Sequence, residues 1–327
     1  MGRIVQQIRV PSSSLYLGRG KVEQLRTLAQ ETDATILLFD GELSPVQGKN
    51  LEQALGLRIM DRAELILDIF ATRARTKEAK MQVELAQLEY LLPRLARMWV
   101  HLSRIRGGIG LRGPGETQIE TDRRMIRRKI SQLKRNLADV ERHRAVLRRG
   151  RRHRPVLTAA LIGYTNTGKS SLLQALTGSA TFVEDRLFAT LDTLTRETEV
   201  APGRRVRLVD TVGFIRKLPH HLVASFRATL EQVARADVLL HVVDASHAHW
   251  EEHIQVVDAV IAELGLNGVD LIHVFNKMDL VDDPDAFQER VARSYEAVAC
   301  VSALTGDVAE LVALLRAATS PAAKTGT

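Results

Sequence analysis

The chain has 327 residues, more than one ordinary hydrophobic core holds, so we expect two or three domains. Hydrophobic residues make up 45% of it, enough for packed cores, whereas aromatic residues at 4% are too sparse for a surface that stacks single-stranded bases. The start lacks an apolar core of signal-peptide length, and no stretch approaches the roughly 20 apolar residues of a membrane span. We therefore expect a cytoplasmic location and no membrane association.

The net charge of +7 is concentrated in one segment. Residues 121–154 hold 14 Lys and Arg against three acidic residues, a net of +11 that leaves −4 for the rest of the chain. A basic segment on a mildly acidic chain predicts a polyanionic partner for that segment. The single cysteine, Cys300, excludes an internal disulfide and is expected to be a buried, inert thiol.

Residues 1–75 predict a small N-terminal α/β subdomain. Short strands are expected at residues 34–39 and 57–60, and helices at residues 44–55 and 63–74, the first opened by Ser44-Pro45. Met1 leads almost directly into strand-like residues, so we interpret this subdomain as one that could be truncated at its start.

Residues 76–154 predict a long antiparallel helical hairpin. Apolar residues recur at steps of three and four over residues 85–102 and again over residues 126–147, and Pro93 should kink or end the first helix near Leu92. The glycine-rich loop 107–115 between the two stripes should not be helical. It is either a flexible tip or, with the basic helix beside it, a probe aimed at nucleic acid. The residues that we expect to contact RNA are Gly107, Gly108, Gly110, Arg112, Gly113, Gly115, Arg123, Arg124, Arg127 and Arg128.

Residues 155–319 predict a doubly wound α/β domain, followed by a short tail at residues 320–327. Apolar strands are expected at residues 156–162, 206–209, 238–243, 271–275 and 297–301, with helical stretches between them. This alternation is typical of a mostly parallel sheet that is covered by helices on both faces.

A phosphate-binding loop follows the first of these strands. Residues 163–170 fit the pattern G-x-x-x-x-G-K-[ST] between a strand and a helix. Glycines let the backbone wrap phosphate oxygens, the lysine adds a positive charge, and the last hydroxyl is a ligand for Mg²⁺. The loop consists of Gly163, Tyr164, Thr165, Asn166, Thr167, Gly168, Lys169 and Ser170.

Three more segments complete a predicted GTP site. The D-x-x-G element should hold Mg²⁺ through water at its aspartate and sense the γ-phosphate with its glycine amide. The N-K-x-D element ends in a carboxylate that can accept from two donors of guanine, which adenine lacks. The loop after the last strand should contact the base as well. These segments are Asp210, Thr211, Val212 and Gly213; Asn276, Lys277, Met278 and Asp279; and Ser302 with Ala303.

A switch segment is expected between the phosphate loop and the D-x-x-G element. It should close when γ-phosphate and Mg²⁺ are bound. Thr190 is the expected second Mg²⁺ ligand, although Thr193 and Thr195 lie near enough in the sequence to compete. The segment consists of Phe188, Ala189, Thr190, Leu191 and Asp192.

These motifs, with the loop GGIGLRGPGETQIE and the preceding RTKEAKMQVELAQLEYLLPRLARMW, resemble the HflX family of translation-factor-related GTPases over nearly the whole chain. The resemblance implies a protein that binds the large ribosomal subunit and splits or rescues stalled ribosomes under stress. It also implies that the hairpin carries its glycine loop toward the peptidyl-transferase region and that the ribosome stimulates hydrolysis. The sequence departs from the family's pattern in two ways. Thr193 stands where the family usually has proline. The N-terminal domain starts late, and no further domain follows the nucleotide domain.

No catalytic residue is assigned. Phe214 stands where Ras-like enzymes carry the glutamine that orients the attacking water, so intrinsic hydrolysis should be slow and a partner should complete the site. Lys169 and Asn166 are candidate stabilisers of charge. Asn166 either coordinates K⁺, as such an asparagine does in related GTPases, or simply braces the loop.

Two other functions stay open from the sequence alone. A ribosome-assembly GTPase would share every nucleotide motif and the basic hairpin. An RNA-binding or remodelling module regulated by nucleotide is the other alternative, although Gly18 to Lys21 is too short for a second phosphate loop. We expect a monomer.

Overall fold

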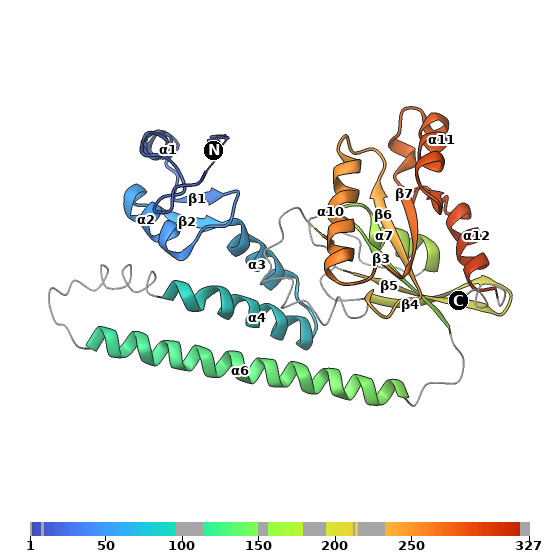
Figure 1. Cartoon of the computed structure of the whole chain (residues 1–327), viewed down its shortest axis with the longest axis horizontal. Coiled ribbons are helices and arrows are strands. Elements are labelled where there is room, and N and C mark those ends of the chain that lie inside the picture. Colours follow the sequence, from blue (N-terminus) through green and yellow to red (C-terminus); the bar gives the residue numbers. More distant parts are fainter. Residues whose placement is uncertain are drawn as a thin grey trace. The chain divides into compact units, whose positions relative to one another are not determined.

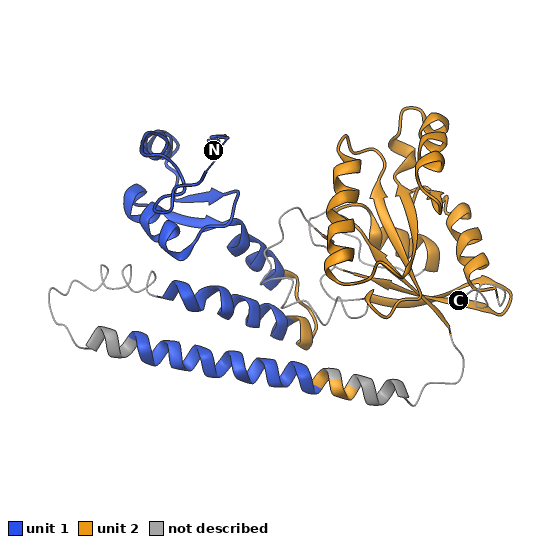
Figure 2. Cartoon of the chain, viewed as in Figure 1, with its two compact units in different colours: residues 1–72, 80–139, 219–222 blue, residues 73–79, 140–218, 223–327 orange. Residues whose placement is uncertain are grey.

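The computed structural model describes residues 2–7, 10–95, 114–149, 156–178, 194–211, 213–214 and 233–320. They belong to two compact units (Figure 2). The first is built on residues up to 72 and on residues 80–139, and the second on residues 73–79 and on most of the chain from residue 140 onward. Within the described ranges, no helix is long and apolar enough to cross a membrane.

The N-terminal part of the first unit contains a two-stranded parallel sheet. Strand β1 (Ile36–Phe39) pairs with β2 (Arg58–Asp61), with Ile36 opposite Arg58. Helix α2 (Pro45–Leu55) begins at a capping box in which the Ser44 and Gln47 side chains each accept from the other's backbone N–H. Helix α3 (Arg62–Arg73) follows β2 directly. These four elements confirm the predicted strands and helices of this subdomain.

The start of the chain differs from the prediction. Residues 2–7, which we interpreted as strand-like, form neither helix nor strand, and helix α1 (Arg19–Glu31) was not predicted. Only Val22 and Leu25 of α1 are fully buried. A helix that offers so few apolar residues to the core has a weak periodic pattern, and this explains why it was missed.

Helices α4 (Lys77–Leu91) and α6 (Pro114–Arg149) run antiparallel, side by side (Figure 1). Lys129 of α6 pairs with Glu84 of α4 at 3.0 Å, and Lys134 of α6 pairs with Glu89 of α4 at 2.8 Å. Leu85 and Leu133 are buried members of the two apolar stripes. The α-helix ends at Leu91 and a short 3-10 turn, η1 (Leu92–Arg94), follows, so the predicted effect of Pro93 is confirmed.

The prediction that all of residues 107–115 are non-helical is wrong at its end. Pro114 and Gly115 form the first turn of α6. Proline suits the first position of a helix because its N–H is not needed there and its φ is already near the helical value. Residues 107–113, and with them the remaining glycines and Arg112, lie outside the described residues, as do Trp99 and Leu102.

A buried arginine joins the hairpin to the small sheet. Arg94 Nη2 donates to the Leu43 carbonyl at 2.7 Å and lies 3.4 Å from Asp61 Oδ2, while its guanidinium stacks over the Tyr90 ring at 3.7 Å. The Asp61 side chain is 3% exposed and also accepts from the Leu43 and Glu64 N–H groups. Every charge in this group therefore has a partner of opposite sign or a hydrogen bond.

The second unit is a six-stranded sheet in the order β4-β5-β3-β6-β7-β8. All neighbours are parallel except β4 and β5. Helices α7 and α12 pack on one face and α10 and α11 on the other, which confirms the doubly wound fold. The strands are β3 (Leu157–Ile162), β4 (Leu194–Ala201), β5 (Arg204–Asp210), β6 (Val238–Asp244), β7 (Asp270–Asn276) and β8 (Val298–Cys300). The helices are α7 (Lys169–Thr177), α10 (Trp250–Glu263), α11 (Pro284–Ser294) and α12 (Ala309–Ala318), with a 3-10 turn η2 (Met278–Leu280) after β7.

Two predictions for this unit need correction. Strand β4 was missed because its sequence, LTRETEVA, is largely polar and exposed, as an edge strand of a sheet can be. Cys300 is half-buried rather than buried. Burial, and secondarily the charge of Glu310, raises the pKa of its thiol to about 11, so the expected inert thiol follows from its environment all the same.

Replacing Arg94 with methionine should destabilise the first unit by about 3 kcal/mol, because the buried Asp61 carboxylate loses its cation. Native-state hydrogen exchange of the β1 and β2 amides measures this unit separately from the other. Arg19→Met, at an exposed position of α1, is the control and should change stability by less than about 0.5 kcal/mol. The double variant Asp61→Asn/Arg94→Met should lose less than the sum of the two single changes; strict additivity would contradict the assignment.

Candidate active site

The loop between β3 and α7 needs glycine at two positions. Gly163 has a φ of 151°, and a Cβ there would lie 2.2 Å from the Val242 carbonyl oxygen. Gly168 has a φ of 87°, and a Cβ there would lie 2.3 Å from Asn276 Nδ2. Neither backbone conformation suits an L side chain, and neither site has room for one. The loop is therefore packed tightly against β6 and against the last residue of β7.

Lys169 is buried at the first position of α7. Its Nζ donates to the carbonyl oxygens of Gly163 at 3.2 Å and Tyr164 at 2.7 Å. Burial lowers its pKa to about 8, and Asp210 partly opposes that shift. An ammonium held by two loop carbonyls next to a helix N-terminus favours an anion, because both the charge and the unpaired N–H groups of the helix attract one.

Ser170 and Asp210 lie together at the carboxyl ends of β3 and β5. Ser170 Oγ donates to Asp210 Oδ2 at 2.7 Å, and Asp210, opposite Leu161 in the parallel register, is fully buried. Thr211 Oγ1 donates to the Leu161 carbonyl at 2.6 Å and fixes the turn after β5. A hydroxyl beside a carboxylate is an oxygen donor set that fits Mg²⁺.

The other expected Mg²⁺ ligands are not all described. Thr190 and Thr193 lie outside the described residues, as do the rest of the switch segment at 188–192 and Val212. Thr195 lies inside β4, opposite Val209 and next to the pair that Leu194 forms with Asp210. The choice among the three threonines stays a prediction.

Residues 213 and 214 contact the phosphate loop through their backbone. A Cβ on Gly213 would lie 3.0 Å from Lys169 Nζ, so the chain passes very close to that ammonium. The Phe214 N–H donates to the Gly163 carbonyl at 3.0 Å, and the Phe214 carbonyl accepts from the Thr165 N–H at 2.8 Å. The Phe214 ring is 4% exposed and packs in the apolar cluster under α10. This position therefore offers backbone hydrogen bonds to the loop and no side chain to orient water.

Asn276 joins the predicted guanine-binding loops to the phosphate loop. Its Nδ2 donates to the Thr167 carbonyl at 2.9 Å, and its Oδ1 accepts from the Ala303 N–H at 2.9 Å. Asp279 is exposed in η2, and its Oδ1 accepts from the buried Ser302 hydroxyl. The structure thus brings together segments from the ends of β3, β7 and β8, as the sequence predicted for a nucleotide site at the carboxyl edge of the sheet.

Two groups at this edge were not predicted from the sequence. Asp244, at the end of β6, accepts from Lys277 Nζ at 2.6 Å and holds that side chain in place. The backbone of Lys277 has a φ of 66°. A carboxylate that directly follows an apolar strand is the signal that could have found Asp244. His253 of α10 stacks on the Tyr164 ring at 3.9 Å between centroids, and no sequence signal marks that contact.

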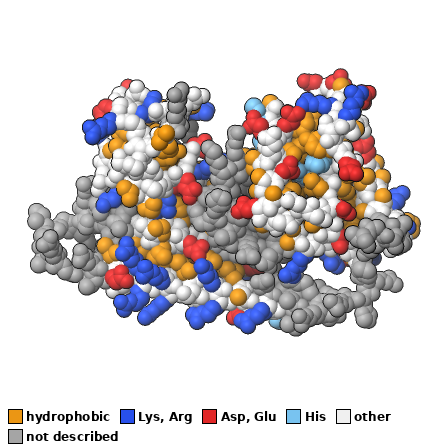
Figure 3. All heavy atoms as spheres, in the orientation of Figure 1, with side chains coloured by type: hydrophobic (Ala, Val, Ile, Leu, Met, Phe, Trp, Pro, Cys, Tyr) orange, Lys and Arg blue, Asp and Glu red, His pale blue; other side chains and the backbone are white. Residues whose placement is uncertain are grey.

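The predicted RNA-contacting residues that the structure describes lie on α6. Arg124, Arg127 and Arg128 are exposed and Arg123 is half-buried. Arg127 lies 3.9 Å from Glu120 on the same helix. Lys and Arg side chains gather along this helix (Figure 3). They form a charged surface that faces solvent, whereas the apolar stripe of α6 faces α4.

Three family models match consecutive parts of the chain. Residues 1–71 match "GTP-binding GTPase N-terminal", residues 73–151 match "GTP-binding GTPase Middle Region", and residues 158–277 match "50S ribosome-binding GTPase". Among solved structures, a GTP-binding protein from the hyperthermophilic archaeon Sulfolobus solfataricus in complex with GDP is 25% identical. Its TM-score is 0.50, and the match covers 95% of this chain and 88% of that one.

Curated relatives are closer in sequence. GTPase HflX of Magnetococcus marinus is 48% identical over 93% of this chain and 70% of its own length, and GTPase HflX of Escherichia coli is 46% identical over 88% and 67%. GTPase HflX of Caldanaerobacter subterraneus is 49% identical over 86% and 66%. The chain thus spans about two thirds of the length of these relatives. With this similarity and a P-loop GTPase domain at residues 158–277, the chain belongs to the HflX family of GTPases.

Proposed function

We propose that this chain binds and hydrolyses GTP, associates with the large ribosomal subunit, and splits or rescues stalled ribosomes under stress. The observation that carries the proposal is the meeting of the phosphate loop, Asn276 and Asp279 at one edge of the sheet. The phosphate loop, which Asn276 holds in place, would bind the phosphates of a nucleotide, and Asp279 would bind its guanine base.

The phosphate loop would hold the β- and γ-phosphates. Lys169 would exchange its contacts with the two loop carbonyls for phosphate oxygens, and Gly213, which passes beside its ammonium, would offer its N–H to the γ-phosphate. A negatively charged ligand would favour the protonated lysine. The phosphates thereby offset the burial that lowers the pKa of Lys169 to about 8 in the absence of a ligand.

Asp279 would read guanine with its exposed carboxylate, which can accept from both N1–H and the exocyclic amine of the base. The Ser302 hydroxyl holds the carboxylate, and Asn276 fixes the loop behind it. Ala303, whose N–H bonds Asn276, brings the second loop to the same place. Adenine lacks both of these donors and would leave the Asp279 carboxylate unpaired against the base, so it is rejected.

Mg²⁺ would be held by Ser170 and, through water, by Asp210, with Thr190 as the proposed second protein ligand. The ion neutralises charge on the β- and γ-phosphates when it is bound. Ser170 and Asp210 already contact each other, so this chain presents both oxygens at one place.

Hydrolysis would depend on a partner. The Phe214 ring is buried in the core under α10, so no side chain at that position can orient the attacking water. The basic surface of α6 supports ribosomal RNA as the partner, because rows of Lys and Arg favour phosphate backbones. The match to a model described as a 50S ribosome-binding GTPase supports the large subunit.

Asp279→Asn should weaken GDP binding by about 100-fold, because two hydrogen bonds to a charged acceptor are lost. The same change should strengthen binding of xanthosine diphosphate, whose C2 carbonyl accepts from the new amide. Isothermal titration with both nucleotides measures these two changes in affinity. Asp282→Asn, an exposed neighbour with the same change of charge, is the control. GDP affinity that stays at the wild-type value in Asp279→Asn would rule out the assignment.

Purified Escherichia coli large subunits should raise the steady-state kcat for GTP by at least about 10-fold, since they complete the site. The variant Arg124→Glu/Arg128→Glu should lose that stimulation and keep the intrinsic rate. Arg290→Glu/Arg293→Glu reverses the same number of exposed charges on α11 and should retain it. An unchanged kcat with saturating subunits would sink the proposed coupling. Light scattering of intact ribosomes with GTP tests splitting directly, and no loss of scattering would leave only subunit binding.

We also propose K⁺ as an activator at the exposed Asn166, which has a φ of 63° and stands clear of the loop core. Hydrolysis in K⁺ buffer should exceed that in Na⁺ buffer by about 10-fold, as a fixed positive charge near the γ-phosphate would allow. Asn166→Gly keeps the backbone conformation and should erase the difference. Equal rates of the wild type in both buffers would leave Asn166 as a loop brace.

A further inference from the structure

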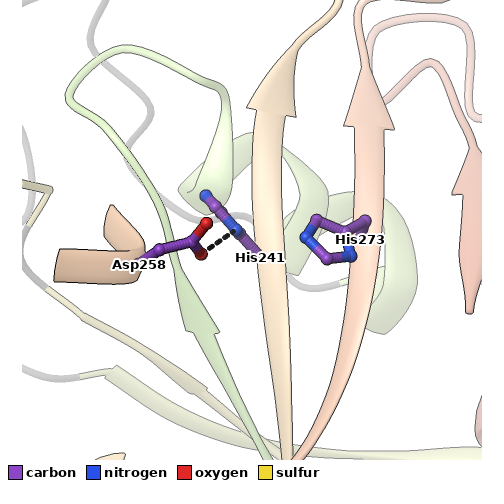
Figure 4. Close-up of side chains that lie close together, drawn as sticks. All are labelled: His241, Asp258 and His273. Carbon is purple, nitrogen blue, oxygen red and sulfur yellow. Dashed lines mark ion pairs between the residues drawn. The ribbon is translucent and has the colours of Figure 1, made fainter. Parts of the chain in front are cut away.

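A second cluster of chemically capable side chains lies away from the nucleotide site, on the face of the sheet that α10 covers. His241 of β6 and His273 of β7 are direct partners in the parallel register, so both side chains stand on the same face. Asp258 comes from α10, which lies over these strands (Figure 4). One ligand atom of each residue lies within 4.8 Å of the other two.

The position of His241 is unusual for an imidazole. Its neighbours on the same face of β6 are Leu239 and Val243, and they belong to the two apolar clusters packed under α10. The His241 side chain is 1% exposed, and its Nδ1 has no hydrogen-bond partner among the described residues. A buried polar atom without a partner is costly, and an aliphatic residue at this place would avoid that cost.

An ion pair does not account for the arrangement. His241 Nδ1 lies 4.0 Å from Asp258 Oδ1, which is too far for a hydrogen bond. Burial, followed by the charges of His273 and Lys169, lowers the pKa of His241 to about 3, and burial lowers that of His273 to about 4. Burial thus favours the neutral form of both rings, which is the form of imidazole that binds metals.

We propose that His241, His273 and Asp258 bind one Zn²⁺ ion that joins β6, β7 and α10. Two imidazole nitrogens and one carboxylate oxygen are a donor set that zinc uses, whereas Mg²⁺ and Ca²⁺ prefer oxygen alone. The Asp258 side chain is 51% exposed, so it gives the ion a path from solvent and leaves a fourth position for water. The unsatisfied Nδ1 of His241 gains its missing partner in this site.

The three ligand atoms must move closer together to bind a zinc ion. Bond lengths of about 2.0–2.1 Å in a tetrahedral zinc site put ligand atoms about 3.3 Å apart, so the His241–Asp258 pair at 4.0 Å must approach by about 0.7 Å and no pair of the three by more than about 1.5 Å. The exposed Asp258 side chain can supply most of that movement by rotation. The Tyr295 ring packs against His273 at 4.3 Å between centroids and limits how far that imidazole can turn away.

Zinc binding to the whole chain tests the proposal, with GDP and excess Mg²⁺ present to occupy the nucleotide site. Isothermal titration should find one Zn²⁺ per chain with a Kd of about 1 µM or tighter at neutral pH, and saturating Zn²⁺ should raise the Tm by about 5 °C. Titration with Co²⁺ should give the visible absorption of a four-coordinate site. None of these measurements depends on GTP hydrolysis or on ribosomes, so the proposal stands or fails separately from the proposed function.

Variants identify the ligands. Asp258→Asn, at an exposed position that does not threaten folding, should weaken Zn²⁺ binding at least about 10-fold, and His273→Gln should weaken it further. Glu263→Gln makes the same change of charge on the same helix, and His249→Gln removes an exposed histidine of the same unit. Both controls should bind as the wild type does. Failure of the wild type to bind Zn²⁺ at about 100 µM, or equal binding in Asp258→Asn, overturns the site.

Discussion

The side chain of Asn276 is the contact on which the nucleotide site depends. One amide group donates to the phosphate loop at Thr167 and accepts from the loop after β8 at Ala303. It is 2% exposed, so neither bond is exchanged readily with water. Its amide nitrogen also lies so close to Gly168 that only glycine fits there. The parts that would hold phosphate and base are thus kept in register by one residue.

Much of this site was predictable because its motifs follow apolar strands at fixed places. The loop from Gly163 to Ser170 directly follows a buried strand, and Asp210 and Asn276 are each the last residue of one. The carboxyl ends of parallel strands lie at the same edge of the sheet. The links between the segments were not predictable. A hydrogen bond between residues 109 positions apart, such as that from Asn276 to Thr167, leaves no trace in local periodicity. Helix α1 and strand β4 were missed for a related reason, since each has too few buried residues to produce a pattern.

Histidines are where the sequence was least informative. His241 interrupts the apolar residues of β6 (Val238–Asp244), and from the sequence it is simply one more residue of a buried strand. Only the register, which sets it opposite His273, and the packing of α10, which brings Asp258 above it, turn it into a cluster. Burial of an imidazole has two outcomes: the ring finds a partner, or its unsatisfied nitrogen destabilises the fold. Neither outcome can be read from composition.

Helix α10 connects the two places in the second unit where chemistry gathers. Near its start, His253 stacks on Tyr164 of the phosphate loop, and five residues further along Asp258 faces His241. Phe214, which supports the loop through its backbone, packs in the apolar cluster beneath the same helix. The same helix therefore contacts the phosphate loop and covers the histidine pair. Residue 214 gives its side chain to this core and its backbone to the phosphate loop, and in the proposed mechanism the orientation of water therefore falls to a partner.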